Sequence, residues 1–508
     1  MVGGTPAGVA AAIAAARRGA NVTLVSEGSD LGGVLTGAMM DQWDLNTAPG
    51  GARVERGIFA EIYARLGDSF TPAAAATLFE QMAAGEPRIA VRYDERLAAL
   101  AMAPQAGGKR IESVSFRDAR TSEPFTVRAP IVIDATDFGD VASLAGAKYD
   151  LGRQDTGVDE GMQAVTEMFT IEGIDWDALA DAYDASRDGN GGVVGRRAWG
   201  YDALMRTYTP RSRAVVVRDL NLGRLPDGTV TVNAIDVVGI DGRDPRQRAE
   251  ARRLTELEAP RLIAFLRARL PGFARARVGS YAPEVYVRET RHIAGLESLT
   301  TADVWLGRVP VDSIGLASYP IDLHPVGAQD RPAFAPLRHV YGVPFGALVP
   351  SGLTNVLIAG PAISASHLAS GSARVIATTI EEGEAAGAAS ALAHHAGVDI
   401  ATFARAAGYV ATLRADLAIN GALVGTPNAP ARYVVAGALA RRPSVCGGPK
   451  GLPRLACTPM STSQGACAAI TSIARPSGAP VYLPSRYAPR TMRCASVSLA
   501  SSSTPAAT

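Results

Sequence analysis

Hydrophobic positions near the N-terminus follow a helical pattern and then a strand pattern. Small apolar residues over 9–18 have the spacing of a buried helix, Gly19 follows as a C-terminal cap, and the run 21–25 predicts a strand. Only Met1 and Val2 precede the glycine turn in front of this helix. Because a central strand of a parallel sheet usually has about five apolar residues, the sequence predicts that the first strand is truncated or missing.

Later segments continue the alternation of short strands and helices. Helical spacing recurs over 72–84, and the apolar run 131–133 leads into a turn, as a buried strand does. A similar strand is predicted at 355–359, and a long small-residue helix at 372–395. The pattern between about 150 and 335 is mixed. We therefore expect one α/β domain that is interrupted by a different, α+β domain.

Charge and composition set the end of the chain apart. The 508 residues carry a net charge of +1, yet all acidic residues lie at or before Asp416 and nine basic ones follow it, so residues 1–416 have a charge of −8. From about 440, Ser, Thr, Pro, Ala and Gly dominate, and all four cysteines lie there at spacings that fit neither a zinc site nor an iron–sulfur run. We predict that residues 428–508 are a disordered or frameshift-derived tail; a cationic interaction arm is the alternative.

The composition also excludes several classes of protein. With 47% hydrophobic and 19% charged residues the chain is too apolar to be disordered throughout. No apolar run approaches the roughly 20 residues of a spanning helix, and no overall charge steers the chain to nucleic acid or anionic lipid. We expect a cytoplasmic protein without a nucleic-acid, membrane or metal partner.

The turn before the first helix carries the clearest chemical signal. Gly3 permits a tight turn and Gly8 lets the helix pack closely on a sheet, while the free N–H groups and dipole of the helix N-terminus suit a pyrophosphate. Thr5 replaces the middle glycine of the dinucleotide fingerprint. After the next strand, Glu27 or the neighbouring position Ser26 faces the ribose in such a site. A glycine turn in an unrelated α/β protein, or a site for NAD alone, remains an alternative.

Four separated blocks of sequence occur in an order that one glycine turn does not explain. Because of these blocks the chain resembles the FAD-dependent oxidoreductases of the glutathione-reductase-like fold, and within them the branch related to the heterodisulfide reductase flavin subunit. The blocks are residues 3–8 with 31–33, then 133–140, then 287–291, and then 355–360 continuing through 371–374 to 383–387.

The resemblance implies a Rossmann-like FAD-binding domain with a parallel sheet and helices, interrupted by an α+β substrate domain. It implies domain limits of 1–150 and 340–427 for the two parts of the FAD domain and 151–339 for the substrate domain. It places the first turn at the pyrophosphate, Glu27 at the ribose, and Gly360 and Gly387 at the ribityl–isoalloxazine end. The cofactor-binding residues that it implies are Gly3, Gly4, Thr5, Pro6, Ala7, Gly8, Glu27, Gly32, Gly33, Ala135, Thr136, Gly360 and Gly387.

Hydride transfer between a substrate and flavin N5 usually needs a base near the flavin. His324 and His367 both lie in segments that match the family, so either is a candidate base. Arg291 is a candidate for positioning the substrate, since guanidinium groups bind anions well. A buried structural role for each histidine, and an ion-pair network around Arg288, Glu289 and Arg291, are the alternatives.

The sequence thus predicts an FAD-dependent oxidoreductase that acts on a small molecule, with the electron acceptor unassigned. Two alternatives stay open. The chain could be the product of a damaged or truncated gene that no longer retains flavin, because its first strand is short. A dehydrogenase that uses NAD alone ranks last, because it gives no reason for the block at 355–387.

Overall fold

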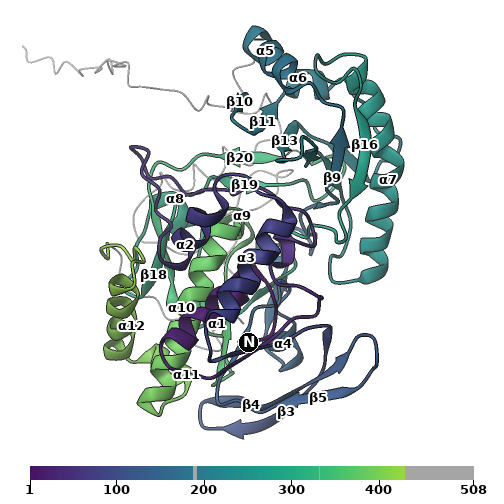
Figure 1. Ribbon diagram of the computed structural model, residues 1–508. Coiled ribbons are helices and arrows are strands. Elements are labelled where there is room, and N and C mark those ends of the chain that lie inside the picture. Colours follow the sequence, from purple (N-terminus) through teal and green to yellow (C-terminus); the bar gives the residue numbers. More distant parts are fainter. Residues whose placement is uncertain (187–190, 331, 429–508) are drawn as a thin grey trace, which may run out of the picture.

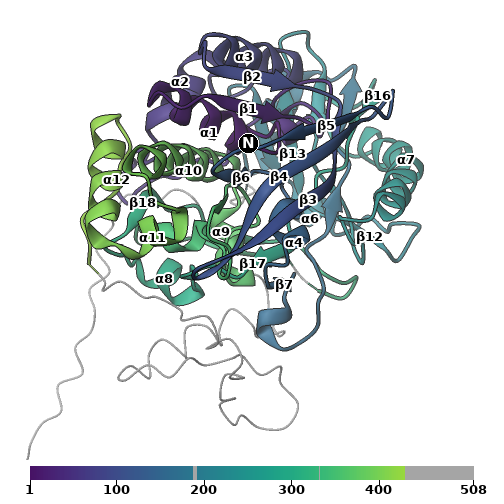
Figure 2. The ribbon, with the colours of Figure 1, turned by 90° about the horizontal axis from the view of Figure 1, so that it is seen from below.

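The computed structural model describes residues 1–186, 191–330 and 332–428 (Figure 1). Its central feature is a parallel sheet built from segments far apart in the sequence (Figure 2). Strand β1 pairs with β2, and β22 pairs with β6, in the same sheet. These strands are β1 (Val22–Val25), β2 (Ile89–Arg92), β6 (Val132–Asp134) and β22 (Val356–Ile358).

The N-terminal residues fill the gap between β1 and β6. Val2 forms parallel bridges to both strands, and its N–H donates to Ile133 O at 2.9 Å. Val25 N donates to Met1 O, and Gly3 N donates to Val25 O. The expectation of a missing first strand is therefore corrected: Val2 occupies the position of this strand between β1 and β6, as a single bridging residue.

Helix α1 (Pro6–Arg17) and helix α10 (Ile376–Ala396) pack against each other on one face of this sheet (Figures 1 and 2). The other face is covered by an antiparallel sheet of β3 (Glu95–Gln105), β4 (Gly108–Asp118) and β5 (Pro124–Val127). Val114 and Phe116 of β4 share one core with Val2 and Ile133. The remaining elements on the helical side are α2 (Gly57–Leu66), α3 (Pro72–Ala84), α11 (Ile400–Arg405) and α12 (Ala407–Ile419).

A second body of structure forms around a six-stranded antiparallel sheet, on which the long helix α7 (Pro245–Arg267) packs (Figure 1). The order of this sheet is β10 (Gly192–Val194), β11 (Arg197–Gly200), β13 (Leu220–Arg224), β14 (Val230–Val232), β9 (Phe169–Glu172) and β16 (Arg277–Tyr281). This second body also contains a three-stranded sheet of β12 (Val215–Val217), β15 (Ile235–Val237) and β8 (Val165–Thr166).

Further elements are short. Three pairs of strands are β7 (Tyr149–Leu151) with β17 (Arg291–Ile293), β18 (Ser313–Ala317) with β21 (Tyr341–Pro344), and β19 (Ile321–Leu323) with β20 (Ala333–Ala335). Helices α5 (Trp176–Ser186) and α6 (Asp202–Met205) belong to the second body, α4 (Asp140–Leu144) packs against β6 and β3, and α8 (Thr301–Leu306) packs against β21. Among the residues that the structure describes, no helix is long and apolar enough to span a membrane.

The prediction of one long helix at 372–395 is wrong at its N-terminal end. The chain instead forms α9 (His367–Ala373) and then α10, separated by Arg374 and by Val375 in an extended conformation. The small residues on both sides satisfy helical spacing, so the pattern gave no sign of the break. Because of this break, Arg374 lies between the two helices, where it reaches Tyr286.

Candidate cofactor and substrate site

The glycine turns predicted to hold a cofactor lie together at the end of the parallel sheet. Gly3 has a φ of +117°, and a Cβ there would overlap the carbonyl oxygen of Ala135. A Cβ on Gly8 would likewise overlap the carbonyl of Gly3. In the second turn, a Cβ on Gly33 would lie 3.2 Å from Cα of Thr5. Backbone therefore approaches backbone throughout this cradle, and larger side chains do not fit.

The first turn of α1 leaves one N–H group free for a ligand. Thr5 is the N-cap: its hydroxyl accepts from Gly8 N at 3.1 Å and donates to Ala135 O at 2.9 Å. Pro6 has no N–H, and Val9 N is bonded to Thr5 O. The N–H of Ala7 is left at the positive end of the helix dipole. Thr5 thus acts as a cap in the position where the fingerprint has its middle glycine.

The predicted cofactor-binding residues Glu27 and Thr136 lie at the ends of strands. Glu27 follows β1 with its side chain 76% exposed and 3.6 Å from Arg96. Ser26, the alternative, is buried and donates to Asp30 O. Thr136 follows β6, where its hydroxyl donates to Asp134 at 2.6 Å and shapes the turn. Glu27 therefore remains available to a ligand, whereas Ser26 is engaged.

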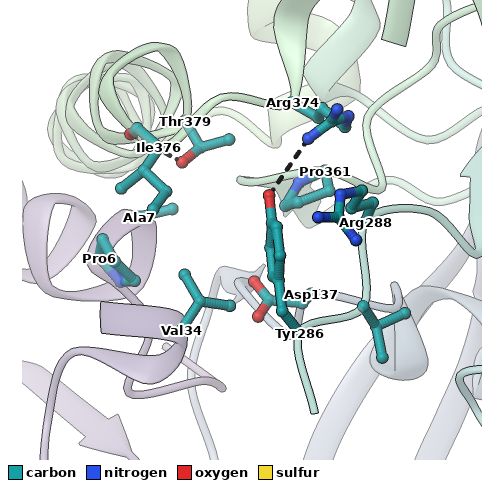
Figure 3. Close-up of a pocket in the computed structure, with 11 residues that line it drawn as sticks. Pro6, Ala7, Val34, Asp137, Tyr286, Arg288, Pro361, Arg374, Ile376 and Thr379 are labelled. Atoms are coloured by element: carbon teal, nitrogen blue, oxygen red, sulfur yellow. Dashed lines mark hydrogen bonds between the residues drawn. The ribbon is translucent and has the colours of Figure 1, made fainter. Parts of the chain in front are cut away.

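A cavity adjoins the first turn of α1 and separates it from the second body of structure (Figure 3). It is small, with a volume of about 20 Å³. Gly360 lies beside it, since a Cβ there would be 3.9 Å from both Ala7 Cβ and Asp137 Oδ1. The lining residues are Pro6, Ala7, Val34, Asp137, Tyr286, Val287, Arg288, Pro361, Arg374, Ile376 and Thr379.

Two buried arginines and one carboxyl group make this cavity polar. Arg374 donates to the hydroxyl of Tyr286 at 3.1 Å and to Asp322 O at 3.1 Å. Arg288 donates to Thr166 Oγ1 at 2.8 Å and has its guanidinium 4.5 Å from the ring centre of Tyr286. Burial, with the neighbouring carboxylates Asp140 and Asp134, raises the pKa of Asp137 to about 7. Asp137 can therefore gain or lose a proton near neutral pH.

His324 lies in a charged network behind the two arginines. Its Nδ1 is 2.8 Å from Asp236 Oδ2, and Arg218 Nη1 is 2.7 Å from its Nε2. Burial, followed by the charges of Arg218 and Arg288, lowers the pKa of His324, so the ring is neutral at physiological pH. Both ring nitrogens are thus engaged within the protein, and His324 is not part of the cavity wall.

His367 belongs to a second buried cluster, centred on Glu289. Its Nδ1 is 2.7 Å from Glu289 Oε1, and His292 Nε2 is 2.9 Å from the same oxygen. Burial alone would raise the pKa of Glu289, but the two histidines hold it below its ordinary range. With Nδ1 on the carboxylate, Nε2 of His367 is the ring atom left to accept a proton, and no described residue bonds to it. His367, like His324, is buried and is not part of the cavity wall.

Two predicted site residues lie elsewhere. Arg291 donates to Asp140 Oδ1 and to Phe138 O, both at 2.8 Å, so it braces the turn after β6 and is not in the cavity wall. The ion-pair interpretation of this arginine fits these contacts. Gly387 faces Ala11 of α1, whose carbonyl a Cβ would overlap. Its small size serves helix packing, and its expected position at the isoalloxazine end stays a prediction.

Sequence reasoning did not assign Asp137, Tyr286 or Arg374 to the site, and it considered Arg288 only as part of a cluster with Glu289 and Arg291 that could bind an anionic or polyol substrate or form an ion-pair network. Both arginines lie within the blocks that carried the resemblance, so the blocks were a usable signal. What the sequence did not give was the direction of their side chains. That direction depends on the break between α9 and α10 and on how β8 packs.

The residues present fit a bound dinucleotide. A Cβ on Gly3 or Gly8 would overlap a backbone carbonyl, so the turn packs closely against the sheet and α1, and the first turn of α1 keeps the N–H of Ala7 for a phosphate. A parallel sheet, a tight glycine turn and a helix N-terminus in this order form the arrangement that binds the pyrophosphate of a dinucleotide. The fold and the site therefore define a dinucleotide-cofactor protein.

Comparison with known proteins identifies the family to which the chain belongs. The family model described as FAD dependent oxidoreductase matches residues 1–417, so the chain belongs to this family and its cofactor is FAD. The chain is accordingly an enzyme, an FAD-dependent oxidoreductase. No curated protein matches the sequence significantly.

Solved flavoenzymes resemble the chain only distantly. p-Nitrophenol 4-monooxygenase PnpA from Pseudomonas putida DLL-E4 is 13% identical over 82% of this chain and 84% of that one, with a TM-score of 0.38. Flavin-dependent brominase Bmp2 is 10% identical over 80% and 82%, with a TM-score of 0.39. The flavin-dependent monooxygenase PieE, solved with FAD and substrate, is 15% identical over 58% and 50%, with a TM-score of 0.29. At this distance the likeness gives no information on substrate or reaction.

Proposed function

We propose that this enzyme transfers a hydride between a small organic substrate and N5 of FAD. The observation that supports this most is the position of the cavity, with the cofactor turn (Pro6, Ala7) on one side and buried polar groups on the other. We further propose that residues 1–150 and 340–427 form the cofactor domain and 151–339 the substrate domain. The branch related to the heterodisulfide reductase flavin subunit remains our proposal for the subfamily.

Each part of the chain has its own task in this proposal. The turn from Gly3 to Gly8 binds the pyrophosphate, Glu27 accepts from the ribose, and Gly32, Gly33 and Gly360 leave room for the extended cofactor. Bound FAD supplies the acceptor or donor of two electrons. The protein supplies orientation, exclusion of water and a site for the proton.

His367 fits the role of proton acceptor better than His324. Glu289 holds Nδ1 of His367 and leaves Nε2 free, which is how a carboxylate orients a histidine base. In His324 the second ring nitrogen is already occupied by Arg218. We therefore propose His367 as the base and His324 as a positioning residue that keeps Asp236 and Asp322 in place beside the arginines.

Spectra of the purified protein test this function. We expect a yellow protein that releases FAD and whose flavin absorption bleaches when small alcohols, amines or hydroxy acids are mixed with it anaerobically. His367→Gln should slow bleaching by about 10²–10⁴-fold, while His324→Gln should mainly weaken substrate binding. Bleaching at the wild-type rate in His367→Gln would contradict the assignment of the base.

The alternative is a damaged gene product that does not retain flavin. Against it stands the position of Val2, whose backbone bonds replace those of a longer first strand. The same spectra separate the two: protein that stays colourless after incubation with excess FAD would favour the alternative.

A further inference from the structure

We propose that the substrate is an organic anion whose carboxylate is bound by Arg288 and Arg374. This inference rests on the proposed function, because it assigns the chemical class of the molecule that occupies the cavity beside the flavin. The two arginines come from different parts of the chain. Arg288 lies between β16 and β17, and Arg374 lies between α9 and α10.

The burial of both arginines is the first argument. Their side chains are only 1% and 2% exposed, and each pairs with a carboxylate of the protein, Arg288 with Asp236 at 3.8 Å and Arg374 with Asp322 at 3.4 Å. Nε of each has no hydrogen-bond partner among the described residues, although both side chains line the same cavity. An unsatisfied buried guanidinium N–H costs free energy that a bound carboxylate would recover.

The arrangement in the cavity is the second argument. Figure 3 shows Arg288 and Arg374 together on the side away from Pro6 and Ala7, with Tyr286 directed toward Arg374. Pro6 and Ala7 belong to the turn that binds the cofactor phosphates. The arginines are anchored from the opposite side: Arg288 on Thr166, and Arg374 on Asp322. They are therefore placed to bind a molecule next to the flavin rather than the phosphates.

Binding of paired probes to the holoenzyme tests this inference. Formate, acetate and benzoate are titrated against formamide, acetamide and benzamide, with the flavin absorption spectrum as the readout. We expect saturable spectral shifts from at least one acid, and binding at least about tenfold weaker for its amide, because only the acid makes charge-assisted bonds to both guanidinium groups. Equal affinity for acid and amide, or no shift with any acid, would overturn the inference.

Variants locate the binding to these residues. Arg288→Met and Arg374→Met should each weaken the acid by at least about tenfold and leave the amide unchanged. Arg288→Lys and Arg374→Lys keep the charge without the planar pair of donors and should give intermediate losses, which covers the case in which a Met variant does not fold. Arg414→Met is the matched control, because Arg414 is half-buried and donates to the backbone oxygen of Gly425 outside the cavity. Acid binding that survives in both arginine variants would overturn the assignment.

The same preparations separate this inference from the proposed function. If the flavin is retained and bleaches with a substrate, but acids bind no better than amides, the inference fails and the function stands. If acids bind selectively to a flavin that no organic substrate reduces, the function fails and the anion site stands.

Discussion

Gly383 of α10 lies against Ala7 of α1 so closely that a Cβ on Gly383 would overlap the carbonyl oxygen of Ala7. One turn further along, Gly387 has the same relationship to Ala11. Small residues at both contacts let the two helix backbones touch. Because Ala7 also lines the cavity, this contact fixes where the first turn of α1 stands relative to the wall contributed by Ile376 and Thr379.

Replacing Gly387 by alanine should separate the helices. The added methyl group has no space next to the Ala11 carbonyl, and overpacking of this kind costs about 1–3 kcal/mol. We expect a lower thermal midpoint with an unchanged ratio of FAD to folded protein. Gly408→Ala is the control, because a Cβ on Gly408 contacts nothing. Loss of FAD without loss of stability would instead place Gly387 at the cofactor.

Replacing Gly8 by valine should abolish flavin retention. A side chain here would displace the Gly3 carbonyl and distort the turn that we propose binds the pyrophosphate. The purified variant should lack absorption near 450 nm and release no FAD, while its far-ultraviolet circular dichroism stays close to that of the Gly408→Ala control. Full flavin occupancy in Gly8→Val would rule out the pyrophosphate assignment.

Arg291→Met should lower stability and leave acid binding intact. Its guanidinium bonds join β17 to the turn that holds Asp140, and their loss should cost about 1–3 kcal/mol in urea unfolding. The affinity for acids should stay within about twofold of wild type, in contrast to Arg288→Met. An equal loss of affinity in both variants would restore the predicted role of Arg291 in positioning the substrate.

Glu384 should make the protein less stable as pH rises. Burial raises its pKa to about 7 in the folded protein, above the ordinary value of 4.5. A raised folded pKa contributes stability that is fully present below pH 4.5 and is lost as pH rises through about 7. The slope from this group should reach ~1.4 kcal/mol per pH unit in that window.

Glu384→Gln should remove this slope while its side-chain oxygen still accepts from Ile58 N. We expect the unfolding free energy of the variant, relative to wild type, to increase between pH 5 and pH 8. Glu250→Gln is the control, because Glu250 lies at the surface beside Arg253. Parallel pH profiles for wild type and Glu384→Gln would contradict the shifted pKa.

The sequence by itself determined the local parts of this protein. The glycine turn at Gly3–Gly8, the helix after it and the buried strand before Thr136 all depend on neighbours within a few residues. Such features follow from steric limits on the backbone and from hydrophobic periodicity. The order of the four blocks was also enough to predict the cofactor, since the family match covers residues 1–417.

Only the tertiary structure decided what the side chains do. Val2 replaces a strand because β1 and β6 lie on both sides of it. Gly387 serves helix packing because α1 crosses α10 at that point, and Arg291 pairs with Asp140 rather than facing the cavity. Arg288 and Arg374, separated by more than 80 residues in the sequence, line one cavity. Side-chain direction depends on which distant segments pack together, and residue spacing along the chain does not indicate which segments these are.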